Sequence, residues 1–283
     1  MRGFRGISPS GWWLAPERRE TVDIEPTSEK RHWDRFWDEA SSVDDVYSNE
    51  GRVAARIARL APLEGKRVLE VGAGSGRDGI ELARGGAEVV SLDYSLPSLR
   101  LIRKQLAAGA SLSVCCGDAF ALPFPDSSFD VVFHQGLLEH FRNPDDLIAE
   151  HARVLKPGGF LLVDVPQRYH YYTVIKHILI SCRRWFAGWE REYSIGELEG
   201  MLRRHSFSIV SSYGEWFNPP IWYRMLRRGI RPLGAALPMY PRLFSVWGRM
   251  FSPAEEAFLR RRWSLYTTLV VGTIGRKEAR AGG

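Results

Sequence analysis

The stretch Val68-Leu69-Glu70-Val71-Gly72-Ala73-Gly74-Ser75-Gly76 decides the fold, because it joins a short apolar strand to a glycine-rich turn. Glycines at such a turn allow positive φ and let a ligand lie against bare backbone, and a following helix offers free N–H groups. The spacing is G-x-G-x-G rather than the G-x-G-x-x-G of dinucleotide binders. A carboxylate two residues before the first glycine favours a cationic ligand over a pyrophosphate. A nicotinamide-dependent oxidoreductase and a purely structural turn remain the less favoured alternatives.

Short apolar strands alternate with helices on the C-terminal side of this stretch. We expect strands at 67–71, 87–92, 111–115, 129–134 and 160–165, helices at 78–84, 96–107 and 145–155, and then a helix at 194–205 and strands at 207–212 and 265–274. Such strands predict a parallel sheet with helices on both faces, wound in two directions. Ligands of these sheets bind beyond the C-terminal ends of the strands, where the winding reverses.

Polar residues follow the predicted strands at the edge where a ligand is expected. Asp93 ends the second strand, where a carboxylate can accept hydrogen bonds from both hydroxyls of a ribose. The alternative is a helix cap, a role for which Ser95 is better placed. Tyr94 can pack on an adenine or lie at the surface, and Asp118, after the third strand, can accept from an adenine amine.

Several motifs occur in an order that resembles a known family. They are Glu70–Gly76, Asp93, Gly117-Asp118-Ala119, Pro125–Asp130, Leu138-Glu139-His140 and Arg153–Gly159. Together they resemble the class I, Rossmann-like S-adenosylmethionine-dependent methyltransferases, in particular the small-molecule branch of type 11. The resemblance covers about residues 60–165 and, more loosely, 194–213 and 265–276. It implies an α/β fold with a doubly wound, seven-stranded, mostly parallel sheet whose last strand is antiparallel, with helical cap insertions.

The resemblance also implies a binding site for the cofactor S-adenosylmethionine. The loop of Gly72, Ala73, Gly74 and Gly76 would line the methionine part, and Glu70 would help to hold the amino group. Asp93 would bind the ribose, with Tyr94 beside it. Asp118 and Ala119 would bind the adenine, and Gln135 would lie near the methionine end.

Methyl transfer from a sulfonium is an in-line displacement that depends on alignment and needs no metal. An oxygen or nitrogen acceptor must also lose its proton. His140 and His134 are the candidate bases nearest to the predicted site, although the pattern around His140 is often structural in the family. The histidines lack metal-ligand spacing, so we expect no metal site. Asn218-Pro219-Pro220 resembles an amine-methylating signature but follows the wrong strand, so we assign it no catalytic role.

The chain divides into a core and insertions. We expect an N-terminal extension with cap helices at 1–60, beginning with a poorly ordered lead-in, and the cofactor-binding core at 61–165. A cap insertion follows at 166–193, a continuation of the core at 194–213, a basic, aromatic-rich cap insertion at 214–264, and the last strand with a tail at 265–283. Residues 166–283 hold 19 Lys and Arg against 8 Asp and Glu, a net +11, which leaves −5 for the rest. The insertions can simply pack on the core, form a hydrophobic lid for a lipid-like acceptor at a membrane surface, or form a nucleic-acid platform.

The sequence therefore predicts a methyltransferase acting on an oxygen or nitrogen of a small, lipid-like acceptor. The alternatives are a non-catalytic S-adenosylmethionine-binding scaffold and a nucleic-acid methyltransferase, which the lack of an RNA-binding module disfavours. No signal peptide or apolar run long enough for a bilayer is evident, which favours a cytoplasmic protein with peripheral membrane contact as an alternative. The three cysteines show no disulfide or zinc pattern and are expected to be buried thiols.

Overall fold

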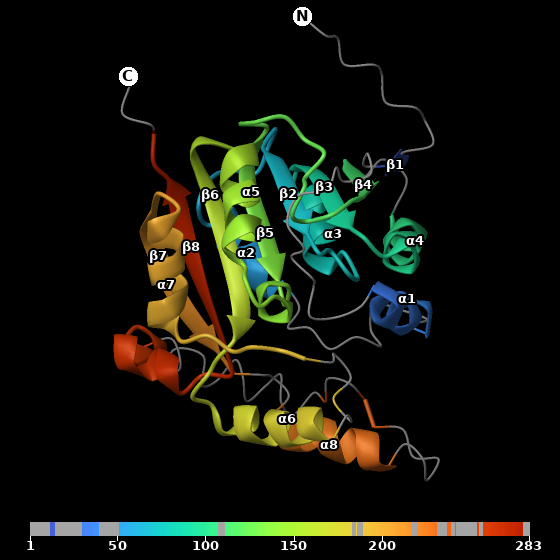
Figure 1. Cartoon of the computed structure of the whole chain (residues 1–283), viewed down its shortest axis with the longest axis vertical. Helices are drawn as coiled ribbons and strands as arrows, with labels where there is room; N and C mark the ends of the chain where they lie inside the picture. Colours follow the sequence, from blue (N-terminus) through green and yellow to red (C-terminus); the bar gives the residue numbers. More distant parts are fainter. Residues whose placement is uncertain are drawn as a thin grey trace, which may run out of the picture.

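The computed structural model describes residues 12–14, 30–39, 51–106, 111–182, 185, 189–216, 220–230, 237–238, 241, 254 and 257–279. Eight strands form one sheet in the order β1-β4-β3-β2-β5-β6-β8-β7 (Figure 1). They are β1 Trp12–Leu14, β2 Arg67–Val71, β3 Glu88–Asp93, β4 Leu112–Cys116, β5 Phe129–Gln135, β6 Leu155–Pro166, β7 Phe207–Glu215 and β8 Val270–Lys277.

The sheet has the predicted winding. All pairs from β1 to β6 are parallel, whereas β8 runs antiparallel to both β6 and β7. Strands β2 to β8 are the seven that we predicted. The N-terminal lead-in, residues 1–20, was expected to be poorly ordered, and no strand was predicted there. The structure describes β1 within this stretch, and β1 pairs with β4 at the edge of the sheet.

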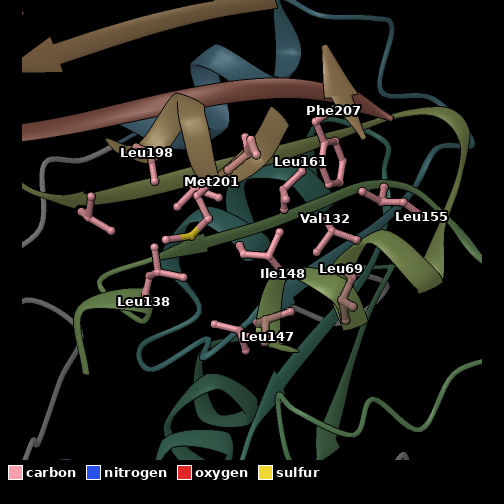
Figure 2. Close-up of a cluster of buried hydrophobic side chains, with 14 of the residues drawn as sticks. Leu69, Val132, Leu138, Leu147, Ile148, Leu155, Leu161, Leu198, Met201 and Phe207 are labelled. Atoms are coloured by element: carbon pink, nitrogen blue, oxygen red, sulfur yellow. The ribbon is translucent and has the colours of Figure 1, made fainter. Parts of the chain in front are cut away.

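Helices cover both faces of the sheet, as expected for a parallel core. They are α1 Lys30–Glu39, α2 Arg52–Ala58, α3 Arg77–Arg84, α4 Leu96–Gln105, α5 Asp145–Val154, α6 Tyr171–Ser181, α7 Ile195–Arg204 and α8 Ile221–Ile230, with short 3-10 helices η2 Leu138–His140 and η4 Arg262–Tyr266. One buried cluster packs α2, α3 and α4 on one face, and the other packs α5 and α7 on the opposite face. Figure 2 shows the second cluster, with Leu147 and Ile148 of α5 and Leu198 and Met201 of α7 near Val132 and Leu161 of the sheet.

Strand alternation assigns neighbouring residues to opposite clusters. In β2, Val68 belongs to the cluster with α3 and Leu69 to the cluster with α5, and in β6 the same holds for Leu162 and Leu161. Every strand at the centre of the sheet is therefore apolar on both faces. This explains why the sequence shows short continuous apolar runs in place of an alternating pattern.

Three strands have boundaries that differ from the prediction by three residues or more. Strand β6 begins at Leu155 because the Lys156–Gly159 turn forms a bulge within it, with Leu155 opposite Phe129 and Phe160 opposite Val131. Strand β7 continues to Glu215, and β8 begins only at Val270. Leu265 belongs to η4 and is buried there, so its hydrophobicity signalled burial and not a strand.

The cap helices α6 and α8 lie beyond the C-terminal ends of the parallel strands (Figure 1). Within the described residues, no helix is long and apolar enough to span a membrane. Cys182, at the end of α6, is exposed, so the expectation of three buried cysteines was wrong for this residue. The Asn218-Pro219 part of the rejected amine-methylating signature lies outside the described residues.

Candidate active site

The glycine loop between β2 and α3 has the conformation that the sequence predicts. Gly72, Gly74 and Gly76 have φ of +64°, +53° and +66°, in the left-handed region that L side chains rarely adopt. A Cβ on Gly72 would lie 2.8 Å from Leu137 Cδ1, and one on Gly74 would lie 2.5 Å from Trp37 Cζ2. The loop therefore leaves no room for side chains and presents its backbone at the end of β2.

Asp93 ties this loop to the end of β3. Its Oδ2 accepts a hydrogen bond from Gly74 N at 2.8 Å and its Oδ1 accepts one from Ser95 N at 2.8 Å. Ser98 Oγ donates to Gly74 O at 2.7 Å and closes the contact from α4. Burial raises the pKa of Asp93, and the amide donors oppose that rise. The carboxylate thus fixes the loop, and each oxygen retains acceptor capacity for a ligand hydroxyl.

Glu70 points towards α3. Its Oε2 accepts from Ser91 Oγ at 2.6 Å, and the backbone of Gly79 also hydrogen-bonds the carboxylate. Burial raises the pKa of Glu70 to about 8. The contacts of Glu70 in the structure are with strand β3 and helix α3, so its expected contact with an amino group of the cofactor stays a prediction.

The residues predicted to bind adenine lie at the ends of neighbouring strands. Asp93 is in register with Cys116 of β4, and Gly117 N donates to Asp93 O at 3.1 Å. Asp118 is exposed and its Oδ1 accepts from Phe120 N at 2.9 Å. Ala119 is half-buried against the core, and Tyr94 is half-buried at the end of β3, where burial raises its pKa. The fold therefore brings Asp93, Tyr94, Asp118 and Ala119 to one edge of the sheet.

The two candidate bases occupy different environments. His134 is fully buried beside His151, with ring centroids 5.2 Å apart. Neither of its ring nitrogens has a hydrogen-bond partner in the described part of the chain, and burial lowers its pKa to about 3. His134 was predicted as a candidate base near the site, but its strand directs the side chain into the core, towards His151 of α5. We therefore assign it no catalytic role.

His140 remains next to the site. It lies in η2, and its ring meets the edge of Trp33 at a centroid distance of 5.0 Å. It also makes a hydrogen bond with the Trp189 backbone. Burial lowers the pKa of His140, although the charge of Glu190 opposes this shift. The ring therefore joins α1, η2 and the segment around Trp189, which is the arrangement of a positioning residue.

Arg52 is a site residue that the sequence analysis missed. Its Nη2 donates to Asp164 Oδ1 at 2.7 Å, and its Nε lies 3.5 Å from Glu215 Oε2. The Gln135 amide bridges Arg52 and Asp78, with its oxygen accepting from Arg52 and its nitrogen 3.1 Å from Asp78 Oδ2. Nη1 of this buried guanidinium has no hydrogen-bond partner among the described residues. Arg52 thus offers an N–H group beside the residue predicted to lie at the methionine end.

Helix α1 covers the glycine loop. Its rings form a continuous edge-to-face series, with centroids 5.6 Å apart for Trp33 and Phe36 and 5.0 Å apart for Phe36 and Trp37. Trp37 lies against Gly74, and Lys30 Nζ lies 5.9 Å from the centre of the Tyr94 ring. Helix α1 falls within the cap helices predicted for residues 1–60, but no sequence signal indicated the surface that it covers.

A buried cluster of charges lies between η2, α6 and the segment that precedes α7. We call Glu139, Lys176, Glu190 and Glu192 the Lys176 cluster. Lys176 Nζ is 2.6 Å from Glu190 Oε2 and 2.6 Å from Glu192 Oε1, and all three side chains are at most 7% exposed. Two carboxylates thus contact one ammonium group, and Glu139 lies close enough for its pKa to be affected by the charge of Lys176.

Glu139 lies beside the turn at Gly136. Its Oε1 would lie 3.5 Å from a Cβ on Gly136, which follows β5. Its Oε2 is buried and has no hydrogen-bond partner in the ranges that the structure describes. Burial, and then the charge of Glu190, raise the pKa of Glu139 well above its usual value. Glu139 belongs to the Leu138-Glu139-His140 motif, for which the sequence predicts no role of the carboxylate.

The comparisons with known proteins identify the class. Residues 69–163 match the family described as Methyltransferase domain. Fatty-acid O-methyltransferase from Mycolicibacterium smegmatis is 41% identical over 223 residues, which cover 77% of this chain and 71% of that protein. The chain therefore belongs to the class I S-adenosylmethionine-dependent methyltransferases, and within them to the Methyltransferase domain family.

Other relatives agree over shorter lengths. Demethylmenaquinone methyltransferase from Renibacterium salmoninarum is 34% identical over 150 residues, or 53% of this chain, and the chain spans only 54% of that relative. Magnesium protoporphyrin IX methyltransferase from Synechocystis PCC 6803, solved with bound SAH, has a TM-score of 0.52 at 16% identity over 80% of each chain. At this identity the likeness concerns the fold alone.

The residues of the site fit S-adenosylmethionine. The glycine loop is a cradle that a Cβ would fill, and Asp93 lies at its edge with acceptor capacity for a ribose. The unpaired N–H of Arg52 suits the cofactor carboxylate, because guanidinium and carboxylate form strong hydrogen bonds. The rings of α1 suit a sulfonium, since aromatic faces attract cations. Among the described residues no group of histidine, cysteine and acidic side chains is suited to a metal ion.

Proposed function

We propose that this chain transfers a methyl group from S-adenosylmethionine to an oxygen atom of a lipid-like acceptor, with long-chain carboxylic acids as the first class to test. The observation that carries the proposal is the extent of the similarity to the fatty-acid O-methyltransferase. That alignment spans 223 residues, more than twice the length of the 69–163 family match, so it includes much of the chain outside the cofactor-binding core. The cap helices α6 and α8 also lie outside the 69–163 match.

On the cofactor side, the glycine loop and Arg52 would hold the methionine part, Asp93 the ribose, and Asp118 with Ala119 the adenine. When bound, the cofactor supplies an electrophilic methyl group on a sulfonium. The work of the protein is to align an acceptor oxygen with that methyl group and to exclude water. Helix α1 is placed for the second task, because its Trp37 ring lies against Gly74.

On the acceptor side, Glu139 is the residue best placed to contact the acceptor. A fatty acid is ionised near neutral pH and needs no base, since ordinary carboxyl pKa values lie near 4. It does need a hydrogen-bond donor to orient it. A protonated Glu139 supplies that donor, because its raised pKa keeps the proton in place. His140 would position η2, and therefore Glu139, through its contacts with Trp33 and Trp189.

A prenylated phenol is the second acceptor to test, because ubiquinone biosynthesis O-methyltransferases also match the chain. A phenol must lose its proton, so Glu139 would then act as an ionised base. The two acceptors thus predict opposite effects of pH on the rate as Glu139 titrates. A scaffold that binds the cofactor without turnover is the remaining alternative.

The test measures the transfer of labelled methyl groups from S-adenosylmethionine to each of three acceptors. The full chain is offered palmitic acid, a prenylated phenol and a water-soluble benzoic acid, and the Gly74→Ala variant serves as the cofactor-site control. Gly196→Ala is the matched control, because a Cβ there would meet nothing closer than 3.8 Å. We expect a labelled methyl ester from wild type and Gly196→Ala, and at least a tenfold loss in Gly74→Ala. Cofactor binding without product from any acceptor would instead support the scaffold.

A further inference from the structure

The described part of the chain exposes large hydrophobic side chains mainly in the cap. Eight of its ten exposed large hydrophobic residues belong to three segments after β6, and each is between 37% and 64% exposed. We call these eight the cap face: Tyr169, Tyr171, Val174, Ile178, Trp222, Leu226, Trp263 and Tyr266. Single exposed hydrophobic residues are ordinary, but concentration in one part of a protein indicates an interaction surface.

Helix α6 contributes most to this face and has an unusual polarity. Its charged residue Lys176 points inward and is held by Glu190 and Glu192, whereas Tyr171, Val174 and Ile178 point outward. A hollow of about 470 Å³ lies along this outer side between Val174, Ile178 and their neighbours. A helix at an ordinary solvent boundary has the reverse arrangement, with its charges facing water.

Helix α8 shows the same division between a fixed and an exposed side. Tyr223 is buried, and its hydroxyl donates to Pro238 O at 2.7 Å. Its neighbours Trp222 and Leu226 are exposed on the helix surface. A third contribution comes from Tyr169 and Tyr266, whose ring centroids are 5.8 Å apart. Helices α6 and α8 both lie at the end of the molecule towards which the parallel strands point (Figure 1).

The charge of the chain indicates what covers this face. Residues 166–283 carry a net charge of +11, whereas residues 1–165 carry −5, and six of the ten tryptophans belong to the basic part. Basic residues together with exposed tryptophan, tyrosine and aliphatic side chains fit the headgroup region of a membrane that contains anionic lipids. A protein partner would not require this excess of positive charge.

We propose that the cap face docks on the surface of an anionic lipid bilayer, so that the acceptor passes from the bilayer to the site without crossing water. The inference rests on the proposed function for its purpose, but the docking itself requires neither cofactor nor acceptor. The two are therefore tested separately, one by vesicle binding and the other by methyl transfer to an acceptor presented in detergent.

The experiment is co-sedimentation of the full chain with vesicles of phosphatidylcholine, and with vesicles of an equimolar mixture of phosphatidylcholine and phosphatidylglycerol. The test variants are the double substitution Val174→Ser with Ile178→Ser, and the single substitution Trp222→Ser. Val210→Ser is the matched control, because Val210 is 49% exposed on β7 and does not belong to the cap face. Thermal unfolding of each variant establishes that the fold is retained.

We expect binding to the mixed vesicles that weakens with salt, and a partition coefficient about tenfold lower in each test variant, since several buried methylene groups are lost. The Val210→Ser variant should bind as wild type does. Absence of binding to the mixed vesicles, or equal binding by wild type and the test variants, would overturn the proposal. A wild-type dimer that the test variants convert to monomer would also overturn it, because a second copy of the chain would then cover the face.

Discussion

Replacement of Lys176 by methionine should lower the free energy of unfolding by about 3–5 kcal/mol near neutral pH, because it leaves buried carboxylates without their cation. The magnitude follows from the burial of the group. Lys176, Glu190 and Glu192 are 3%, 7% and 5% exposed, and the ammonium group makes a 2.6 Å contact with each glutamate. Methionine has a similar length, so little of the loss would come from a cavity.

The pH dependence of this loss gives a second test. Burial lowers the pKa of Lys176, but the charges of Glu190 and Glu192 raise it by more, so the net shift of the pKa is upward. The stabilisation by Lys176 is therefore complete below the ordinary lysine pKa and is lost only as pH rises through the higher folded value. The variant leaves two buried carboxylates without their cation, and the cost of such burial applies only to ionised carboxylates. Its deficit relative to wild type should shrink as the pH falls towards the ordinary glutamate range.

Urea unfolding followed by circular dichroism, at about pH 7.5 and about pH 5.5, measures both effects. The matched control is Lys156→Met. Lys156 pairs with Asp130 at 2.8 Å but is 40% exposed, so its loss should be about 1 kcal/mol or less. If Lys176→Met and Lys156→Met lost equal free energy, or if the Lys176→Met deficit grew at the lower pH, the reasoning from buried charge would be refuted.

Three further predictions concern the site. Arg52→Lys should weaken S-adenosylmethionine binding about tenfold by calorimetry, because lysine lacks the planar fork, whereas the more exposed Arg56→Lys should not. Because the pKa of Glu70 is raised to about 8, the melting temperature of wild type should decline as the pH rises from about 4.5 to 8. Glu70→Gln should flatten this decline, and an unchanged decline in the variant would contradict the prediction. With a fatty-acid acceptor, kcat/KM should fall as pH rises through the pKa of Glu139, and Glu139→Gln should keep activity but lose this decline. Loss of all activity in Glu139→Gln would instead indicate a base.

Much of the cofactor half could be predicted because its signals are local. The three glycines have positive φ within a five-residue loop. Asp93 and Asp118 each come at the end of a short apolar run, which marks the end of a strand. In a parallel sheet the C-terminal ends of all the strands lie on the same side, and this does not depend on how the rest of the chain packs. The number of strands and the reversal of the last strand came from the family resemblance, and the structure confirmed the reversal of β8. The order of the strands comes from the structure.

The sequence by itself thus determined the elements, the winding of the sheet and the backbone of the glycine loop. Only the tertiary structure decided which side chains meet there. Arg52 pairs with Asp164, which is 112 residues away in the sequence. The side chain of His134 points into the core because successive residues of a strand face opposite sides of the sheet. The placement of Trp37 over Gly74 and of Lys176 between two glutamates likewise depends on how helices pack on the core. Periodicity and turn chemistry act over a few residues, whereas burial and charge pairing are settled by contacts between distant segments.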